Sequence, residues 1–403
     1  MNRSTSLPRR SETAAISAAF AVNGVLFASW VSRLPAARDH LHASEPQLGL
    51  ALLGTAVGAL VAMPTTAWLG ARFGTRRVLL TAMALASAAL QLAALMGSVA
   101  ALALALTLFG LTVGVWDVSM NTVAHDIELR ARRPWMPKFH GAFSVGALVG
   151  AALGGLAAGA GLSVRWHVLL AGLVTAAVAV VAFRALVEPR RVERAPVGHS
   201  AGPRRRVNRT LVVLGLITVC TTLGEGAAAD WSGIFLHDVR GAAESTAAIG
   251  YAVFAMAMAI GRFGGSWVLS RISRVDALRA SGALVFSGLF ALLALPSVAT
   301  GLAAMAVWGF GVALVFPAAM SAAAEHAPDP AQGIATVASI GYAGFLFGPP
   351  TIGFLAGHVG LGVALWVVAG LGIVLAWLAR DAGPGPYAGE LPAQAVDRES
   401  VLI

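Results

Sequence analysis

The sequence has few of the residues that a water-soluble enzyme needs. Charged residues make up 12% of its 403 positions, against roughly 25% in soluble domains. Cys220 is the only cysteine and lies in an apolar run, which excludes a disulfide framework. Lys138 is the only lysine and Phe139 follows it, so the Gly-Lys-Ser/Thr of an ATP-binding phosphate loop is absent. These absences exclude a soluble enzyme and ATP binding through such a loop.

Long apolar runs are what the sequence has instead. Hydrophobic residues make up 58% of the chain, and the mean hydropathy is +0.78. A membrane-spanning helix needs ~20 apolar residues, and a bilayer has no water for an unpaired backbone. The sequence therefore predicts an all-α integral membrane protein with twelve transmembrane helices, at residues 13–34, 47–70, 76–97, 99–124, 140–161, 166–187, 210–231, 246–269, 276–296, 298–323, 332–357 and 360–379. A signal peptide is the alternative for the first run, but its full length favours a retained helix.

The basic residues are divided unequally between alternate breaks in this pattern. Of the 28, 23 lie in the termini and in the breaks on one side, four lie on the other side, and Arg262 lies inside a run. The net charge of +9 therefore orients the chain and does not indicate nucleic-acid binding. Because cytoplasmic loops carry the positive excess, both termini are predicted to be cytoplasmic. The predicted segments are cytoplasmic tails at 1–12 and 381–403, six-helix halves at 13–187 and 210–380, and a basic cytoplasmic linker at 188–209.

An internal repeat supports two halves in parallel arrangement. Shifts of 198 and 199 positions superpose glycines of the first half on glycines of the second. The pairs include Gly146 with Gly344, Gly150 with Gly348, and Gly110 with Gly309.

The break after the second run resembles the loop signature of the major facilitator superfamily. It reads Arg72-Phe73-Gly74-Thr75-Arg76-Arg77, with Ala67 and Ala71 where the signature has Gly and Asp. The resemblance implies the major facilitator fold, in which two pseudo-symmetric six-helix halves surround a midplane cavity. It also implies a cytoplasmic gating loop formed by Arg72, Gly74, Arg76 and Arg77. Without the Asp, this loop lacks its usual charge partner.

A closer resemblance is to the fucose-permease-like branch, specifically the YbjJ-type inner-membrane proteins of bacteria. The segments that carry it are 23–24, 32–35, 116–121, 139–144, 225–232 and 341–345. The resemblance implies a multi-pass protein of the bacterial inner membrane. It also implies that a carboxylate at Asp117 is linked to proton coupling. Val31 stands where the branch has an acid in the first span, so a coupling scheme with two acids is not implied.

Ionisable side chains inside the spans are functional candidates, because each costs ~3 kcal/mol to insert. Asp117 lies deep in the fourth run, and Asn121 follows by one helical turn on the same face. Glu225 and Asp230 lie in the seventh run, with Asp230 nearer the outer interface. We predict that Asp117 and Glu225 couple protons and that Asn121 and Asp230 line the substrate cavity. The alternative for each is a structural polar group satisfied by a neighbouring helix.

Aromatic residues supply further cavity candidates. Asn23, Phe27 and Trp30 form a stripe at helical spacing, for which cavity lining and ordinary packing are equally open. Trp308 and Tyr342 are candidates for stacking on a substrate, with a core or lipid-facing position as the alternative.

Two motifs concern helix packing. The fifth run reads Gly146-x-x-x-Gly150-Ala151-x-x-Gly154-Gly155. It resembles a drug-antiporter signature with Ala151 in place of its Pro, and it predicts close packing between helices. Gly348-Pro349-Pro350 predicts a break or bend in the eleventh run.

No metal or cofactor constellation accompanies these groups. His40 and His42 are the only close histidine pair, and no Gly-x-Ser-x-Gly elbow occurs. We therefore predict a secondary active transporter, not an enzyme, that moves a small polar or sugar-like solute by alternating access with proton coupling. Its partners are the solute, protons and the lipid bilayer, without nucleic acid or ATP, and we expect a monomer. The alternatives are a proton-driven efflux antiporter for a drug or toxic metabolite, and a membrane receptor that does not transport.

Overall fold

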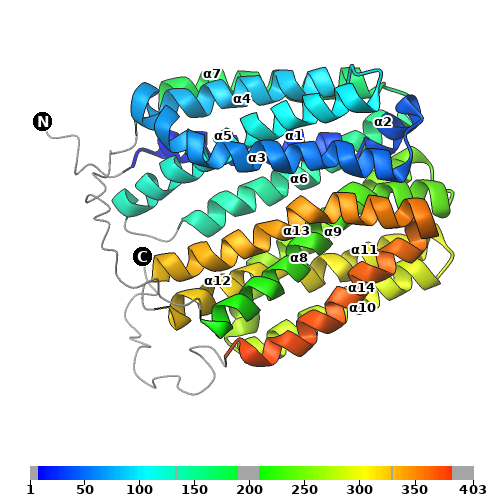
Figure 1. Cartoon of the computed structure of the whole chain (residues 1–403). Coiled ribbons are helices and arrows are strands. Elements are labelled where there is room, and N and C mark those ends of the chain that lie inside the picture. Colours follow the sequence, from blue (N-terminus) through cyan, green and yellow to red (C-terminus); the bar gives the residue numbers. More distant parts are fainter. Residues whose placement is uncertain (1–7, 132–134, 189–207, 328–329, 384–403) are drawn as a thin grey trace, which may run out of the picture.

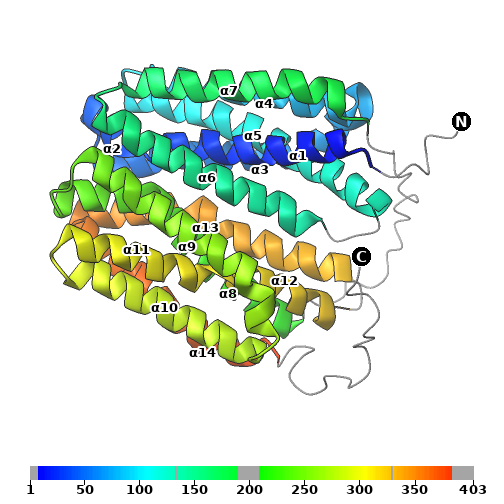
Figure 2. The ribbon, with the colours of Figure 1, turned by 180° about the vertical axis from the view of Figure 1, so that it is seen from behind.

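The protein is a bundle of long helices that run roughly side by side (Figures 1 and 2). The computed structural model describes residues 8–131, 135–188, 208–327 and 330–383, which contain no strand. The first half consists of α1 (Arg10–Val31), α2 (Leu34–Leu41), α3 (Glu45–Phe73), α4 (Thr75–Ala93), α5 (Val99–Ala131), α6 (Met136–Gly159) and α7 (Val164–Ala185). The second half consists of α8 (Arg209–Ile234), the π-helical turn η2 (Phe235–Val239), α9 (Glu244–Leu269), α10 (Arg274–Ala294), α11 (Val298–Ala313), α12 (Val315–His326), α13 (Pro330–Val359), α14 (Leu361–Leu378) and the 3-10 turn η3 (Ala379–Asp381).

The twelve predicted spans are confirmed. Within the described residues, 11 helical segments are long and apolar enough to cross a membrane, with α8 and η2 forming one and α11 and α12 another. The remaining predicted run forms α13, which has 30 residues and is therefore about 45 Å long. It contains no Asp, Glu, Lys or Arg.

Local sequence signals set where several helices begin. Ser44 and Gln47 form a capping box at the start of α3, with Gln47 Oε1 accepting from the Ser44 N–H at 2.9 Å. The Asn208 side chain accepts a hydrogen bond from the Thr210 N–H at 3.1 Å, which satisfies a donor that α8 leaves unpaired. Short breaks in the apolar pattern therefore coincide with helix caps.

The two halves repeat the same packing pattern. α1 packs on α6 as α8 packs on α13, and α3 packs on α5 as α9 packs on α11. The repeated glycines lie at these equivalent contacts. A Cβ at Gly110 would strike the Thr55 carbonyl of α3, and a Cβ at Gly309 would strike the Phe254 carbonyl of α9. The internal repeat is thus expressed as matching close approaches between helices.

The halves meet mainly along two pairs of helices, α6 with α9 and α3 with α13. Gly155 of α6 faces Ser245 and Ala248 of α9, and Gly49 of α3 faces Pro349 and Pro350 of α13. We call the end of the bundle where α7 ends and α8 begins the linker end, and the opposite end the α2 end.

The structure differs from the sequence expectations in three places. The first run divides at Ser32, and α2 follows as a separate short helix. The tenth run divides at Leu314, because Pro317 in the first turn of α12 has no N–H to donate to the preceding turn. No break occurs at Pro349 and Pro350, since α13 continues through both prolines; a bend at this position stays a prediction.

The predicted linker and tails fall largely outside the described residues, which include only Glu188, Asn208 and Arg209 of the linker. The outward faces of the helices carry large apolar side chains, such as Leu104 and Leu156, that are mostly exposed. A soluble monomer rarely exposes so many, so these faces suit a lipid environment.

Candidate functional site

Asp117 and Asn121 form a polar pair inside the span of α5. Asn121 Nδ2 donates to Asp117 Oδ1 at 3.2 Å and to the Asp117 carbonyl at 2.9 Å. Both side chains are half-buried. The predicted common face is therefore real, and the amide holds the carboxylate in a defined orientation.

Tyr342 of α13 is a residue of the second half on which the charge of Asp117 acts. It is 39% exposed, tilts against Phe345 with ring centroids 6.4 Å apart, and lies within range of the charge of Asp117. The charge of Asp117 in the first half thus acts on the hydroxyl of Tyr342 in the second half.

Glu225 of α8 is paired with a residue that the sequence analysis did not select. Arg262 of α9 donates from Nη2 to Glu225 Oε1 at 3.1 Å, while its Nε has no hydrogen-bond partner among the described residues. The charge of Arg262 also reaches His140 of α6, across the interface. The sequence feature that could have identified Arg262 as a site residue was its position as the one basic residue inside an apolar run.

Asp230 lies on α8, nearer the α2 end than Glu225. It is half-buried and makes no hydrogen bond or ion pair with a described residue. Tyr251 of α9, also absent from the predicted site, lies within range of the charges of Glu225, Asp230 and Arg262. Asp230 thus has no counter-charge among the described residues, and its charge acts on the Tyr251 hydroxyl.

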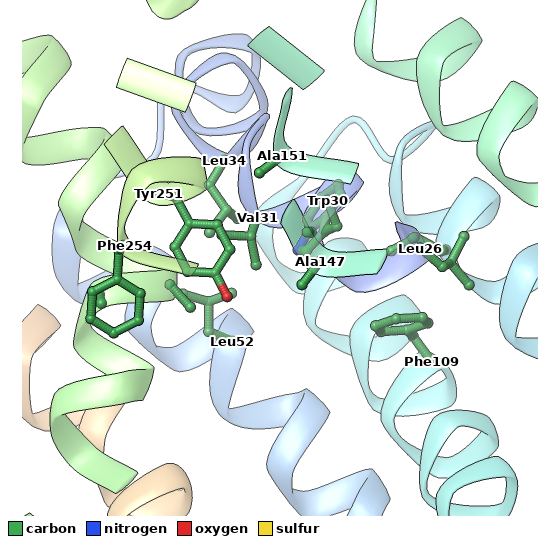
Figure 3. Close-up of a cluster of buried hydrophobic side chains, with 14 of the residues drawn as sticks. Leu26, Trp30, Val31, Leu34, Leu52, Phe109, Ala147, Ala151, Tyr251 and Phe254 are labelled. Carbon is green, nitrogen blue, oxygen red and sulfur yellow. The ribbon is translucent and has the colours of Figure 1, made fainter. Parts of the chain in front are cut away.

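An aromatic wall extends from Tyr251. Its ring stacks on Phe254 with centroids 6.0 Å apart and an interplanar angle of 19°, and Phe254 meets Trp308 edge to face at 5.4 Å. Trp308 is fully buried, so it supports this wall from behind. Figure 3 shows Tyr251 beside Val31 and Leu52 of the first half.

The predicted stripe on α1 lies mostly in packed surroundings. Asn23 is 6% exposed and Trp30 is 3% exposed, and Phe27 is half-buried. Figure 3 places Trp30 beside Ala147 of α6. Asn23 Nδ2 and Trp30 Nε1 have no hydrogen-bond partner among the described residues, so both keep an unused donor.

The loop between α3 and α4 gains a carboxylate from elsewhere in the chain. Glu188, just after α7, accepts hydrogen bonds from the backbone N–H groups of Thr75 and Arg76. Gly74 adopts φ +88°, and a Cβ there would press against the Glu188 carboxylate. Arg72 lies over the Phe73 ring at 5.6 Å, and Arg77 is exposed in the first turn of α4. Glu188 thus supplies the acid that the loop signature lacked.

At the α2 end, ion pairs cross between the halves. We call the ion pairs Arg33–Glu244 and Arg38–Asp238, together with the contact between His237 Nε2 and Asp39 Oδ2, the clasp. Arg33 Nε lies 2.7 Å from Glu244 Oε1 in an ion pair that lacks hydrogen-bond geometry, while Arg33 Nη2 donates to the Leu162 carbonyl at 2.8 Å. Burial alone lowers the pKa of Arg38, but the hydrogen bonds and charges of Asp238 and Asp39 outweigh it and raise that pKa.

The linker end has a different arrangement of charges. Its ion pairs between described residues join helices of one half, as in Arg130–Glu12 at 2.9 Å and Arg274–Glu325 at 2.5 Å. Within the described part of the chain, therefore, ion pairs tie the halves together at the α2 end alone.

A bundle of two related six-helix halves, with ionisable groups facing each other inside the spans, is the architecture of a membrane transporter. The chain belongs to the Major Facilitator Superfamily, whose profile matches residues 14–338. It is 35% identical to an uncharacterized MFS-type transporter of Yersinia pestis, over 90% of this chain and 93% of that protein. It is 31% identical to the membrane protein MosC of Rhizobium meliloti, over 90% of this chain and 88% of that protein.

Solved structures share the fold. The nucleoside transporter NupG matches with a TM-score of 0.74 and 14% identity, covering 93% of this chain and 99% of that one. A bacterial homologue of the lysosomal transporter Spinster, inward-facing and occupied, matches with a TM-score of 0.76 and 16% identity, covering 94% and 97%. A D-xylose-proton symporter matches with a TM-score of 0.70 and 13% identity, covering 91% and 97%.

Proposed function

We propose that this protein is a secondary active transporter of the bacterial inner membrane, which moves a small polar solute by alternating access coupled to protons. The observation that carries the proposal is Asp117, a carboxylate inside a span of one half whose charge reaches Tyr342 of the other half. Groups that both halves present to each other change their surroundings when the halves move, as alternating access requires.

Asp117 is the better proton carrier of the two predicted acids. Its carboxylate accepts one hydrogen bond from Asn121 and has no cationic partner among the described residues, whereas Arg262 neutralises Glu225. A buried carboxylate without a counter-charge is costly, and binding a proton removes that cost. Glu225 then acts as the fixed partner of Arg262.

The clasp and the α3–α4 loop suit opposite gates of such a cycle. With the linker on the cytoplasmic side, the clasp lies on the outer side and holds the halves together there. Arg72, Gly74, Arg76 and Arg77 then lie at the cytoplasmic end, where Glu188 holds the start of α4.

The relatives support a polar solute and a transport function without catalysis. NupG is described as a nucleoside transporter, and the xylose protein as a proton symporter. Both substrates are rich in hydroxyl groups, which suit hydrogen-bonding side chains such as Asn121 and Tyr342.

The test uses purified protein in liposomes with an imposed pH gradient and a panel of radiolabelled sugars, nucleosides and amino compounds. Asp117→Asn keeps the shape of the side chain but cannot titrate, so it should abolish pH-driven accumulation or extrusion while counterflow exchange continues. Asn121→Ala should weaken substrate affinity and leave the pH dependence in place. If Asp117→Asn still concentrates solute against its gradient as well as the parent, the proton-carrier role is wrong. If the parent binds a solute and never moves it, the transporter proposal gives way to a receptor.

A further inference from the structure

A cavity at the α2 end is lined by residues of the first half alone. Its volume is about 400 Å³, which is within the range of ligand-binding pockets, roughly 300–1,000 Å³. The lining comes from α2, the end of α4 and the starts of α5 and α7, and it includes Arg33, His40, Leu95, Met96, Ser163 and Arg165.

The charged side chains of this cavity are basic. Arg33 and Arg165 line it, and none of the described lining residues is Asp or Glu. Arg165 makes no ion pair with a described residue, and its guanidinium lies over the Trp166 ring at 5.9 Å. The charge of Arg165 is therefore left without a counter-charge among the described residues.

Arg33 gives an independent indication of a ligand. Its side chain is 3% exposed, with Nε 2.7 Å from Glu244 Oε1 and Nη2 donating to the Leu162 carbonyl at 2.8 Å. Its Nη1 has no hydrogen-bond partner among the described residues, although buried donors are normally paired and costly to leave unpaired. Because Arg33 lines the cavity, an anionic ligand there can supply the acceptor that Nη1 lacks.

The start of α7 contributes further donors at the same cavity. Ser163 precedes the helix and its side chain makes no capping hydrogen bond, while Ser163, Val164 and Arg165 all line the cavity. The first N–H groups of a helix have no partner within it and form the positive end of the helix dipole. Such helix starts bind phosphate groups.

The rest of the lining suits an apolar group attached to the anion. Leu95, Met96 and Leu102 supply apolar side chains. Trp166, beside Arg165, is 52% exposed at the beginning of a predicted span, and tryptophan is enriched where spans meet the lipid head groups. At that level, phosphate is an anion that the surrounding lipids themselves carry.

We propose that this cavity binds a phosphate group, which is held by Arg165, by Nη1 of Arg33 and by the first N–H groups of α7. A phospholipid head group and a free phosphate compound share this chemistry, and a phospholipid would also place its acyl chains against the apolar lining. The inference goes beyond the proposed function and does not depend on it, because none of the lining residues belongs to the predicted coupling or substrate groups.

The test titrates three probes onto the purified full-length protein in detergent while its thermal unfolding temperature is followed. The probes are inorganic phosphate, dihexanoyl-phosphatidylglycerol and dihexanoylglycerol, which has the same chains without the phosphate; ionic strength is kept constant with sodium chloride. We expect the phosphate-bearing probes to raise the unfolding temperature in a saturable manner and dihexanoylglycerol to have no such effect. A lower half-saturating concentration for the phospholipid assigns the site to a lipid, and a lower one for inorganic phosphate assigns it to a free phosphate compound.

Variants locate the binding at the cavity. Arg165→Gln should raise the half-saturating concentration about tenfold. Arg271→Gln is the matched control, because Arg271 is likewise exposed and lies over the Trp267 ring at 4.0 Å, but at the linker end; it should respond as the parent does. Ala36→Phe fills the cavity from a half-buried lining position without changing any charge, and it should abolish the response in a protein that elutes as the parent does on size exclusion.

Four results would overturn the inference. They are a parent that neither phosphate-bearing probe stabilises, a response to dihexanoylglycerol as large as that to the phospholipid, an Arg165→Gln protein that responds as the parent does, and an Arg271→Gln protein that is weakened equally. An Ala36→Phe protein that keeps the full response would show that surface charge binds the phosphate and that the cavity does not.

Discussion

The clasp allows a quantitative prediction about the balance between conformations. Arg33 is 3% exposed and Glu244 is 27% exposed, with their charged atoms 2.7 Å apart. At an effective dielectric constant of ~20, such charges attract by about 6 kcal/mol before desolvation is counted. Breaking a fully buried pair costs ~3–5 kcal/mol, and an exposed pair ~0–1 kcal/mol. Because one partner is partly exposed, we expect Glu244→Gln to destabilise the state closed at the α2 end by about 1.4–2.8 kcal/mol, which is a 10- to 100-fold shift in population.

The assay measures the distance between the halves at the α2 end. Spin labels at Leu95 and Leu295, exposed positions that follow α4 and α10, are introduced in a Cys220→Ala background. Pulsed electron resonance should give mainly short distances for the parent, and Glu244→Gln should add a population at longer distances.

A matched control removes an ion pair at the linker end. Glu12→Gln breaks the Arg130–Glu12 pair, which joins α1 and α5 within the first half at 2.9 Å. It should lower the unfolding temperature without changing the distance distribution. If Glu244→Gln leaves the distribution unchanged, or if Glu12→Gln shifts it equally, ion pairs across the α2 end do not set the conformational balance.

The remaining predictions concern helix capping and helix packing. Glu188→Ala removes the acceptor at the start of α4 and should lower the free energy of unfolding by about 1 kcal/mol, which is measured as a lower unfolding temperature. Glu188→Gln keeps an acceptor oxygen and should recover part of this stability. Equal losses for both variants would show that the contact lacks a capping role. Gly146→Ala places a Cβ against the Ala21 carbonyl of α1 and should destabilise the protein by about 1–3 kcal/mol. Gly370→Ala, where a Cβ meets nothing within 4 Å, should be neutral or stabilising by up to ~1 kcal/mol, and a Gly146→Ala protein as stable as this control would contradict the close-packing argument.

Sequence reasoning located the spans well because hydropathy and length are nearly sufficient to define a membrane helix. It placed Asp117 and Asn121 on one face because helical periodicity alone fixes that relation. The break at Leu314 and the continuous helix through Pro349 depend on local backbone geometry. Proline can end a helix or lie within one, so its identity alone did not decide between these outcomes.

The candidate site was less predictable, because its partners come from distant parts of the chain. Glu225 and Arg262 are 37 positions apart, and Glu188 reaches a loop 112 positions away. No local pattern reports such pairings. Tyr251 went unnoticed since a tyrosine in an apolar run usually lies at an interface or in the core, and only the charges around it set it apart.

The π-helical turn η2 separates the acids of α8 from the clasp residues that follow them in the same span. A residue inserted into an α-helix turns everything beyond it by ~100°, and π-turns accommodate such insertions at functional positions. Glu225 and Asp230 precede η2, whereas His237 and Asp238 of the clasp lie within it. Deleting one residue from Phe235–Val239 would rotate the clasp residues relative to Arg38 and leave the orientation of the upstream acids intact. The affinity for solute and the strength of the outer closure can therefore diverge independently among relatives of this protein, although one continuous span carries both.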